Sequence, residues 1–421
     1  MKPATAVIGA AVIAASSAAT AAVSDAEFAE MRAEFAALAQ RLNALEVENA
    51  RLKDAKEQTL RDVRINPEQV AMVGESKSAA SWTDRIKIRG DFRYRYESID
   101  VQDDPARDRN RIRARAVIVA QLEDHVEVGL GFATGGDEPT SSNQTLGGGG
   151  STKDLRLDLA YFNWAAVDNL NVIGGKFKNI WYRPQKHGLI WDGDYNPEGI
   201  AATFSSGVFF ASAGGAWLES DRKKSNTEFS WGTQAGFKGA LGGAALVAGV
   251  GYYDMDTAGG EPFFGGPSDF FGNSFTCEDF VNNLGCSYVY DYKEIEVFAD
   301  ASMNIAELPV SVFADYVVND DADENDTGYA VGLKLGKAKS KGSWEVAYIW
   351  QDLEADAVLG LLTDSDFGGG GTDAKGHVFK AGYAINQAWK LKLTYFKLKI
   401  DGNQGDERDF DRIMLDTVFK Y

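Results

Sequence analysis

The sequence predicts an all-β transmembrane protein: a sixteen-stranded antiparallel up-and-down β-barrel with a short N-terminal α-helical coiled coil. Three observations predict this fold. After residue 85, hydrophobic and polar residues alternate through one segment after another, the connections between these segments are alternately short and long, and the last segment ends on an aromatic residue, Tyr421. A barrel wall with lipid on one face and water on the other produces this period of two.

The composition fits a barrel and argues against several other classes of protein. Hydrophobic residues make up 44% of the 421 residues, and 45 glycines against 9 prolines suit many strands joined by tight turns. No apolar run of 18 residues follows the first 25, so no transmembrane helix is expected. A formal net charge of −19 argues against a nucleic-acid partner. Three scattered histidines argue against a metal or catalytic centre, and no cofactor is expected.

Residues 1–22 have the features of a secretory signal peptide. Lys2 precedes an apolar run from Ala4 to Ala15, and Ala19-Thr20-Ala21 supplies small residues for cleavage. An Ala-rich membrane anchor is the alternative. Export to an oxidising compartment predicts that the two cysteines, Cys277 and Cys286, form a disulfide. In the chain-entropy model, closing so short a loop stabilises by roughly 2–3 kcal/mol.

Residues 25–58 show a helical heptad pattern. The a positions are Phe28, Phe35, Leu42 and Asn49, and the d positions are Met31, Leu38, Leu45 and Leu52. About four heptads predict a coiled coil, and the asparagine at a would fix its register. A single helix packed on the barrel is the alternative, because a buried helix shows the same stripe. Residues 59–84 are predicted to form a linker, with Pro67 and Gly74.

Residues 85–421 are predicted to form the barrel. The expected strands are about 86–98, 109–122, 125–134, 154–165, 169–179, 198–204, 208–218, 228–240, 243–254, 288–304, 309–318, 327–337, 343–353, 374–385, 389–400 and 410–421. Short connections, such as Leu241-Gly242, alternate with longer ones, such as 135–153, 180–197, 255–287 and 354–373. Short periplasmic turns and longer outer loops are typical of outer-membrane barrels, so both ends of the barrel are expected to face the periplasm.

The opening strand I-K-I-R-G-D-F-R-Y-R-Y, the alternating loops and the closing strand R-I-M-L-D-T-V-F-K-Y together resemble the Gram-negative porins. The resemblance is to porins with a short coiled coil before a sixteen-stranded barrel. It implies a homotrimer in the cell outer membrane, in contact with lipid and lipopolysaccharide. It also implies a water-filled channel for passive diffusion of small hydrophilic solutes and ions, and no enzyme activity. The coiled coil would offer a contact with the cell wall.

Basic residues share one face of several predicted strands, opposite the aliphatic residues. An arginine at the lipid midplane costs about 2–4 kcal/mol, so this face is expected to line the lumen. The fourth strand would place Arg156 and Asp158 inward and Leu155, Leu157 and Leu159 outward. The predicted cationic wall comprises Arg89, Arg93, Arg95, Arg111, Arg113, Arg115, Arg156, Lys176 and Lys178. The alternative is a solvated wall without a role in selectivity, because porin lumens are polar in any case.

The resemblance also implies that the third outer loop, from Ile180 to Glu198, folds into the lumen. Its carboxylates Asp192, Asp194 and Glu198 are the candidates to face the cationic wall, and it also carries Arg183, Lys186 and His187. Two other loops are acidic: one has Asp320, Asp321, Asp323, Glu324 and Asp326, the other Glu354, Asp356, Asp364, Asp366 and Asp373. We expect a solvated acidic rim there; a calcium site is the alternative, although the spacing lacks the full pattern.

Three functions remain compatible with these patterns. The leading one is passive diffusion. An anion- or substrate-selective channel for phosphate-like or acidic solutes is the alternative that the arginines favour. A third is a membrane anchor or cell-wall tether, which needs neither a lumen with asymmetric charge nor sixteen strands, because eight strands already enclose a filled interior.

Overall fold

The computed structural model describes residues 85–123, 125–220, 228–403, 405 and 407–421, together with Ala44, Val47, Glu48 and Arg51. The chain divides into two compact units, Met1–Ala79 and Ala80–Tyr421. The four isolated residues are helical and exposed and fall within the predicted helix 25–58. The predicted signal peptide, the a and d positions of the coiled coil and the linker lie outside the described residues and stay predictions. None of the helices in the described part has the length and apolar character needed to cross a bilayer.

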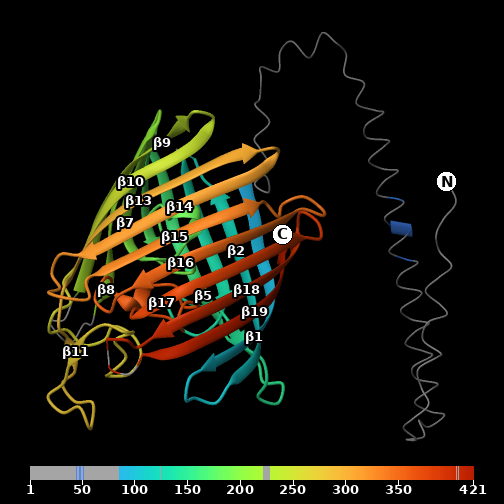
Figure 1. The fold of residues 1–421 in the computed structure, drawn as a ribbon. Helices are drawn as coiled ribbons and strands as arrows, with labels where there is room; N and C mark the ends of the chain where they lie inside the picture. Colours follow the sequence, from blue (N-terminus) through green and yellow to red (C-terminus); the bar gives the residue numbers. More distant parts are fainter. Residues whose placement is uncertain are drawn as a thin grey trace, which may run out of the picture. The chain divides into compact units, whose positions relative to one another are not determined.

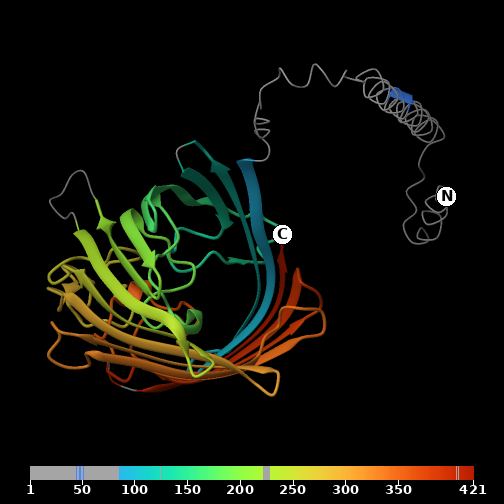
Figure 2. The same ribbon diagram turned by 90° about the horizontal axis from the view of Figure 1, so that it is seen from above.

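The described part of the second unit forms a closed antiparallel barrel (Figures 1 and 2). Each long strand pairs with the next in the chain, and β1 also pairs with β19, which closes the sheet. Its sixteen long strands are β1 (Ile86–Val101), β2 (Arg107–Gln121), β3 (Val126–Thr134), β5 (Leu155–Val167), β6 (Leu170–Lys176), β7 (Glu198–Ser206), β8 (Phe209–Glu219), β9 (Glu228–Leu241), β10 (Ala244–Met255), β13 (Tyr292–Ile305), β14 (Leu308–Asn319), β15 (Thr327–Gly336), β16 (Trp344–Leu353), β17 (Ala374–Ala384), β18 (Trp389–Ile400) and β19 (Arg408–Lys420).

The prediction of sixteen strands is confirmed, and so is the alternation of the connections. The strand bounds differ from the predicted ones by at most four residues, at the start of β13. Turns such as Gly242-Gly243, with φ of 58° and 88°, have the positive angles that a two-residue hairpin turn requires. At the other end of the barrel lie the long loops. Three of them matter below: L3 (177–197), L5 (256–291) and L7 (354–373).

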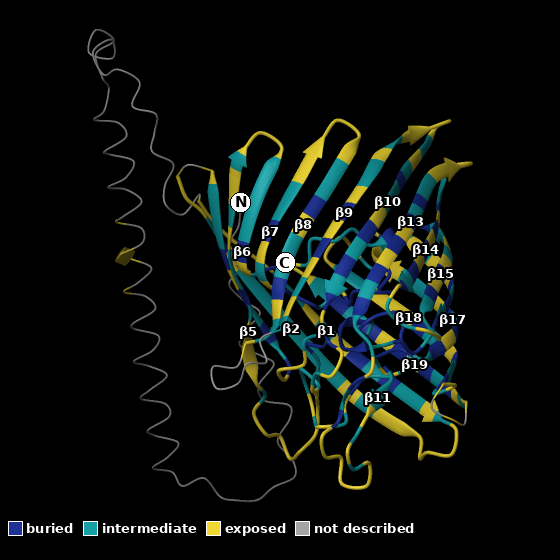
Figure 3. Ribbon diagram, turned by 90° about the vertical axis from the view of Figure 1, so that its left-hand side faces the viewer, coloured by how far each residue is buried: buried dark blue, intermediate teal, exposed yellow. Residues whose placement is uncertain are grey.

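The outward face of the barrel is apolar, whereas the inward face carries charged and polar residues together with apolar ones that pack against the inserted loops. Ile88, Val250 and Leu415 are 63%, 54% and 48% exposed, whereas Glu97, Glu296 and Arg412 on the opposite parity are 0–2% exposed. Exposed and buried residues alternate along the strands in Figure 3. The exposed apolar residues are those that lipid would cover, which is the arrangement of a transmembrane barrel.

One parity assignment is wrong. The register between β3 and β5 shifts so that Gly131 pairs with Leu159 but Phe132 pairs with Leu157, which leaves Asp158 as an extra residue. Such a β-bulge reverses the facing of the residues beyond it. Leu159 is therefore 2% exposed and faces inward, whereas Leu157 is 53% exposed and faces outward.

The long loops fill part of the barrel interior. Leu189, Ile190 and Trp191 of L3 and Leu359 and Leu361 of L7 belong to one buried core cluster. The same cluster includes wall and L5 residues: Tyr253, Met255, Phe270, Tyr288, Tyr292, Val317 and Leu353. L3 therefore enters the barrel, as expected, and L7 enters with it.

The expectation that L7 forms a solvated acidic rim is wrong. Asp356 is 1% exposed and accepts hydrogen bonds from Ser274 and Tyr292, while Asp366 pairs with arginines of the wall. The cause is the apolar run Ala357–Leu362, which takes the loop into the interior and brings its carboxylates along. In the loop between β14 and β15, Asp320, Asp323 and Glu324 remain exposed.

The disulfide prediction is confirmed. Cys277 and Cys286 are bonded to each other in L5, next to the short strands β11 (Phe275–Thr276) and β12 (Ser287–Tyr288), which pair. The bond closes only a local segment, so it shapes L5 and not the barrel.

Candidate channel constriction

The arginines of β1 and β2 face one another across a hydrogen-bonded strand pair. In the register, Arg93 lies opposite Arg113 and Arg95 lies opposite Arg111. Like charges directly opposite each other are destabilising. The same face carries two carboxylates, Asp91 opposite Arg115 and Glu97 opposite Arg109, and the inward loops supply more. These carboxylates hold the arginines together in two clusters.

The first cluster joins the wall to L3. Asp91 lies 3.0 Å from Arg113 Nη2 and 2.7 Å from Arg115 Nη2. Asp194, from L3, lies 3.2 Å from Arg113 Nη1 and 2.7 Å from Arg115 Nη1. Ser142 Oγ also donates to Asp194, at 3.1 Å. Burial alone would raise the pKa of Asp194, but Arg113 and Arg115 outweigh it and hold that pKa below its usual range.

The second cluster joins the wall to L7. Asp366 lies 2.9 Å from Arg95 Nη1 and 2.8 Å from Arg412 Nη2. Asp416 Oδ1 lies 2.7 Å from Arg95 Nε, and Glu97 Oε2 lies 2.6 Å from Arg412 Nη2. Despite burial, Arg95 and Arg412 hold the pKa of Asp366 well below its usual range. Several arginines on the inward face of β1 and β2 thus have carboxylate partners.

Glu97 extends the second cluster to two more arginines of β2, of which Arg111 was predicted to belong to the cationic wall and Arg109 was not. Arg109 pairs with its carboxylate, and Arg111 Nη1 lies 3.5 Å from it. The sequence prediction placed Asp366 in a solvated acidic rim and gave Arg412 no role at the constriction. Two features of the sequence could have pointed to these residues. Phe367, next to Asp366, follows the apolar run of L7, and Arg412 has the inward parity of its strand.

Asp192 joins L3 to L7 and does not contact the arginine wall. Its carboxylate accepts hydrogen bonds from the backbone N–H groups of Asp194, at 2.5 Å, and Ser365, at 2.9 Å. Its own N–H donates to the Leu362 carbonyl at 2.7 Å. Burial, Asp364 and Asp194 together raise the pKa of Asp192 well above its usual range.

The remaining predicted residues are not among the ion pairs of the two clusters; Lys178 lies near the first one, with its Nζ 3.8 Å from Asp158 and its charge helping to lower the pKa of Asp194. Glu198 is the first residue of β7, and its carboxylate lies 2.8 Å from Lys176 Nζ. Both line a cavity that Asp158 and Asp194 also line, and Lys176 donates to the Asn196 carbonyl of L3 at 3.2 Å. Lys178 donates to Asn196 Oδ1 at 2.9 Å. Arg89 and Arg156 are exposed, and Arg156 lies 3.4 Å from Asp154. Arg183 donates to the Trp191 carbonyl at 3.0 Å, which fixes the turn of L3.

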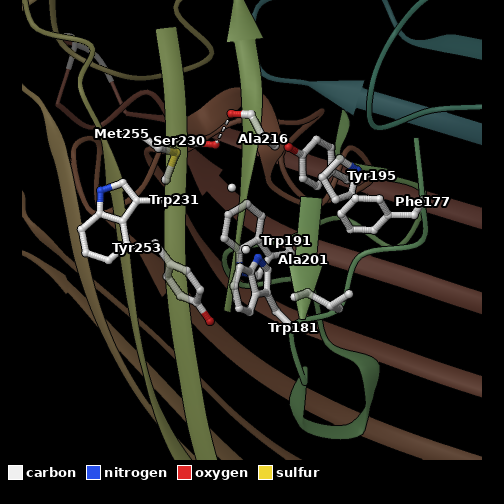
Figure 4. Close-up of a pocket in the computed structure, with 14 residues that line it drawn as sticks. Phe177, Trp181, Trp191, Tyr195, Ala201, Ala216, Ser230, Trp231, Tyr253 and Met255 are labelled. Carbon is white, nitrogen blue, oxygen red and sulfur yellow. Dashed lines mark hydrogen bonds between the residues drawn. The ribbon is translucent and has the colours of Figure 1, made fainter. Parts of the chain in front are cut away.

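Aromatic residues hold the base of L3 against the wall (Figure 4). The ring of Tyr253, from β10, meets those of Trp181 and Trp191 edge to face, with centroids 5.1 and 5.0 Å apart. Trp191 also stacks on Tyr195. Further along L3, Tyr182 donates to Asp300 of β13 at 2.6 Å. Edge-to-face pairs of this kind contribute beyond the area they bury, so L3 is fixed at its base and at Asp194.

The inward loops separate two cavities. One, of about 570 Å³, lies on the long-loop side and is lined by residues from 136–142 of the loop after β3, by residues of L3, L5 and L7, and by Asp158. The other, of about 370 Å³, is lined by inward residues near the short-turn ends of the strands, including Lys380, Lys392 and Glu345. Within the described residues, no group of three or more His, Cys, Asp or Glu side chains is placed to hold a metal ion. The arrangement is that of a wall, two inserted loops and water-accessible space on either side.

Comparisons with known proteins agree with this architecture. Residues 99–262 and 275–417 match the family model described as "Putative porin". The structure of Pseudomonas putida OprB at high pH superposes with a TM-score of 0.55 at 14% identity, over 80% of this chain and 95% of OprB. Salmonella typhi OmpF in complex with daunomycin gives a TM-score of 0.47 at 10% identity, over 80% of this chain and 97% of OmpF. No curated protein sequence matches the chain.

The likeness to OprB shows a shared fold, and the family model covers well over half of the chain. Family and fold imply a channel and not an enzyme. The barrel is closed, has sixteen long strands and an apolar outer face, and encloses clusters of paired charges. A porin model matches most of its strands. The chain therefore belongs to this porin family and is a passive channel of the cell outer membrane.

Proposed function

We propose that small hydrophilic solutes and ions pass through an aperture bounded by β1 and β2 on one side and by L3 and L7 on the other. The observation that carries this proposal is that both loops reach the arginine wall through carboxylates, Asp194 from L3 and Asp366 from L7. Paired arginines and carboxylates keep the aperture polar and of fixed width. A solute that sheds little water passes most easily through such a site.

The same pairing bears on ion selectivity. Arg95, Arg113 and Arg115 each lie within 3.0 Å of a carboxylate oxygen, so their charge is largely balanced where they stand. We therefore propose weak ion preference at this aperture, in place of a strongly cationic constriction. Selectivity for an anion would have to come from cations that lack such partners.

Two measurements on the full-length protein test the proposed function. Planar bilayers should show discrete conductance steps in KCl, with a small reversal potential in a salt gradient. Proteoliposomes should swell in small sugars and progressively less in larger ones. An absence of conductance steps and swelling, with heat-modifiable electrophoretic mobility showing a folded barrel, would favour the membrane anchor.

We also propose that the protein assembles as a homotrimer. A shallow apolar groove of about 980 Å³ lies on the outward face of β8 to β14, with Ala211, Ala235, Ala248, Ala299 and Ala314 between Phe209, Phe237 and Tyr316. Small residues allow close approach between membrane-embedded surfaces. The predicted coiled coil would add a second contact and a link toward the cell wall, and the outer loops would meet lipopolysaccharide.

Light scattering in detergent tests the assembly. Three barrels per particle are expected for the native chain, and Ala248→Trp should reduce this number because it fills the groove. Leu393→Trp, on the lipid-facing side of β18, is the matched control and should leave the particle mass unchanged. One barrel per particle for the native chain would contradict the trimer.

A further inference from the structure

The cavity on the short-turn side of the loops contains the cations that the arginine clusters leave unpaired. Arg93, Lys186, Lys334, Lys380 and Lys392 all line this 370 Å³ space. In the described part of the chain, none of the five has a carboxylate oxygen within 4.0 Å. They come from β1, L3, β15, β17 and β18, so the fold and not the local sequence gathers them.

The strand register places three of the lysines close together. Lys334 and Lys380 both lie opposite Ala347, on the two sides of β16, so two strand spacings, roughly 10 Å, separate their backbones. Lys380 lies opposite Thr394, and Gly382 lies opposite Lys392, which makes the two lysines diagonal neighbours across β17 and β18. Ala347 is small and leaves space between Lys334 and Lys380, whereas the Glu345 side chain lies over Gly382.

The hydrogen-bond acceptors of two of these cations are neutral amide oxygens. Arg93 donates to Asn143 Oδ1 and Lys334 to Gln185 Oε1. The Nε atom of Arg93 is buried and has no acceptor. His187 lines the same space, and burial lowers its pKa to about 3, so it adds no charge at neutral pH. Neutral amides satisfy hydrogen bonds but leave the positive charges uncompensated.

The carboxylates of this cavity do not balance the five cations. Asp366 and Asp416 are taken up by Arg95 and Arg412. Glu345 accepts a hydrogen bond from the Ala338 N–H. Burial and the neighbouring Asp366 raise the pKa of Asp364, which favours its neutral form. Even with Glu345 and Asp364 both ionised, the cations remain in excess.

We propose that this cavity is a binding site for small oxyanions that carry two or more negative charges, such as inorganic phosphate or a short dicarboxylate. The proposal rests on the chain being a channel and deepens that function by naming a class of solute. Several like charges in a confined space repel, and an oxyanion with several acceptor oxygens relieves this repulsion at more than one cation at once. Guanidinium and ammonium groups together are the usual partners of such anions.

Calorimetric titration of the folded full-length protein in detergent, at low salt, tests the site. The probes are inorganic phosphate, succinate and glucose, which separate an inorganic anion, a dicarboxylate and a neutral solute. Saturable binding is expected for phosphate, succinate or both, and none for glucose. The double variant Lys380→Gln with Lys392→Gln should weaken binding roughly tenfold or more, since each lost contact is a charge-assisted one.

Two further variants keep the test decisive. Lys397→Gln, on the outward face of β18, removes one positive charge, as Lys186→Gln does, and should leave binding unchanged. Lys186 lies in the inserted loop L3 and not in a strand of the barrel, so its replacement should disturb folding least. Lys186→Gln should therefore weaken phosphate binding even if the double variant fails to fold. The proposal would be contradicted if the wild-type protein bound none of the anions. It would also be contradicted if the double variant and Lys186→Gln bound them as tightly as the wild type. Conductance in KCl, measured on the same samples, reports separately on whether the channel itself is open.

Discussion

The arginines on the inner face of β1 and β2 act through their partners. Arg113 and Arg115 share Asp91 of their own wall and Asp194 of L3, while Arg95 reaches Asp366 of L7. Buried charges are costly unless they are paired, so each arginine fixes a carboxylate and thereby a loop. A single substitution in these clusters is therefore expected to move a loop as well as to change a charge.

Asp194→Asn tests this role at the L3 end. Losing the carboxylate leaves Arg113 and Arg115 with Asp91 alone and should cost roughly 1–3 kcal/mol of the free energy that holds L3. We expect noisier single-channel currents and a reversal potential shifted toward anions. Asp103→Asn, at an exposed loop position, makes the same charge change and should show neither effect. Quiet currents in Asp194→Asn would mean that the aromatic base alone positions L3.

Asp192 gives the contact between L3 and L7 a pH dependence. Its pKa is raised in the folded protein, by burial, Asp364 and Asp194, so the native state binds its proton more tightly than the unfolded chain does. The stability it contributes is fully present below the usual value of 3.8 and is lost as pH rises through the raised pKa. The protection factor of the Asp192 amide, the intrinsic exchange rate at each pH divided by the observed one, should fall over that window. Asp192→Asn should remove this pH dependence; an unchanged profile would contradict the assignment.

Sequence parity predicted which face most of these residues occupy, and the resemblance named Asp194 as a candidate to face the arginines, but neither pointed to Asp366. Alternation places Arg113 and Arg115 inward because lipid excludes them, and this argument needs only local sequence. The ion pair between Arg95 and Asp366 depends on a loop more than 250 residues away, which no local pattern reports. Parity also failed at Leu159, because a bulge adds one residue to β5 without a signal in the hydrophobic pattern.

At the scale of elements, L5 supports L7 from the side. Asn273 of L5 donates to the carbonyls of Ala355 and Val358 at 2.7 and 2.8 Å, and its Oδ1 accepts from the Gly360 N–H at 2.8 Å. Asn273 itself is 0% exposed. Since a buried backbone group left without a partner costs about 1–3 kcal/mol, this side chain stabilises the path of L7 through the barrel.

Asn273→Ala should loosen L7 while the barrel stays intact. The three hydrogen bonds to the L7 backbone and a longer one to Thr372 Oγ1, at 3.4 Å, are lost, so hydrogen exchange should rise at Gly360 and along the apolar run of L7. Asn282→Ala, on the exposed tip of L5, is the control and should leave L7 protection unchanged. Equal protection of L7 in both variants would show that packing alone holds the loop.

The disulfide has a local effect. Replacing Cys277 and Cys286 with serine should make L5 more sensitive to limited proteolysis, because the closed segment loses its constraint. The unfolding temperature of the barrel should stay the same, since none of the sixteen long strands is part of that segment. A large drop in barrel stability would contradict this local role.

The loops were the part that sequence predicted least well. A run of acidic residues in L7 is typical of a solvated rim, and the apolar residues between them gave the opposite signal. Interior packing decided the outcome, because Val358, Leu359 and Leu362 find partners only inside the barrel. The resemblance to porins predicted that L3 enters the barrel, and the structure agrees.

At the scale of the whole molecule, the barrel follows from a pattern that repeats sixteen times. A period of two over each strand, with short and long connections in turn, leaves one topology in which every backbone group finds a partner within the membrane. Closure by β1 and β19 then needs no further signal. The interior is different, because which loops enter depends on long-range packing. The central claim is therefore that two loops, and not one, narrow this channel.

Single-channel conductance of an L7-shortened variant tests that claim most directly. Residues 358–369 would be replaced by Gly-Ser-Gly, with replacement of 280–283 at the exposed tip of L5 by Gly-Ser as the control. If L7 bounds the aperture, the shortened variant should conduct more than the wild type in the same KCl solution, and the control should match the wild type. Equal conductance in all three folded proteins would show that L7 does not narrow the channel.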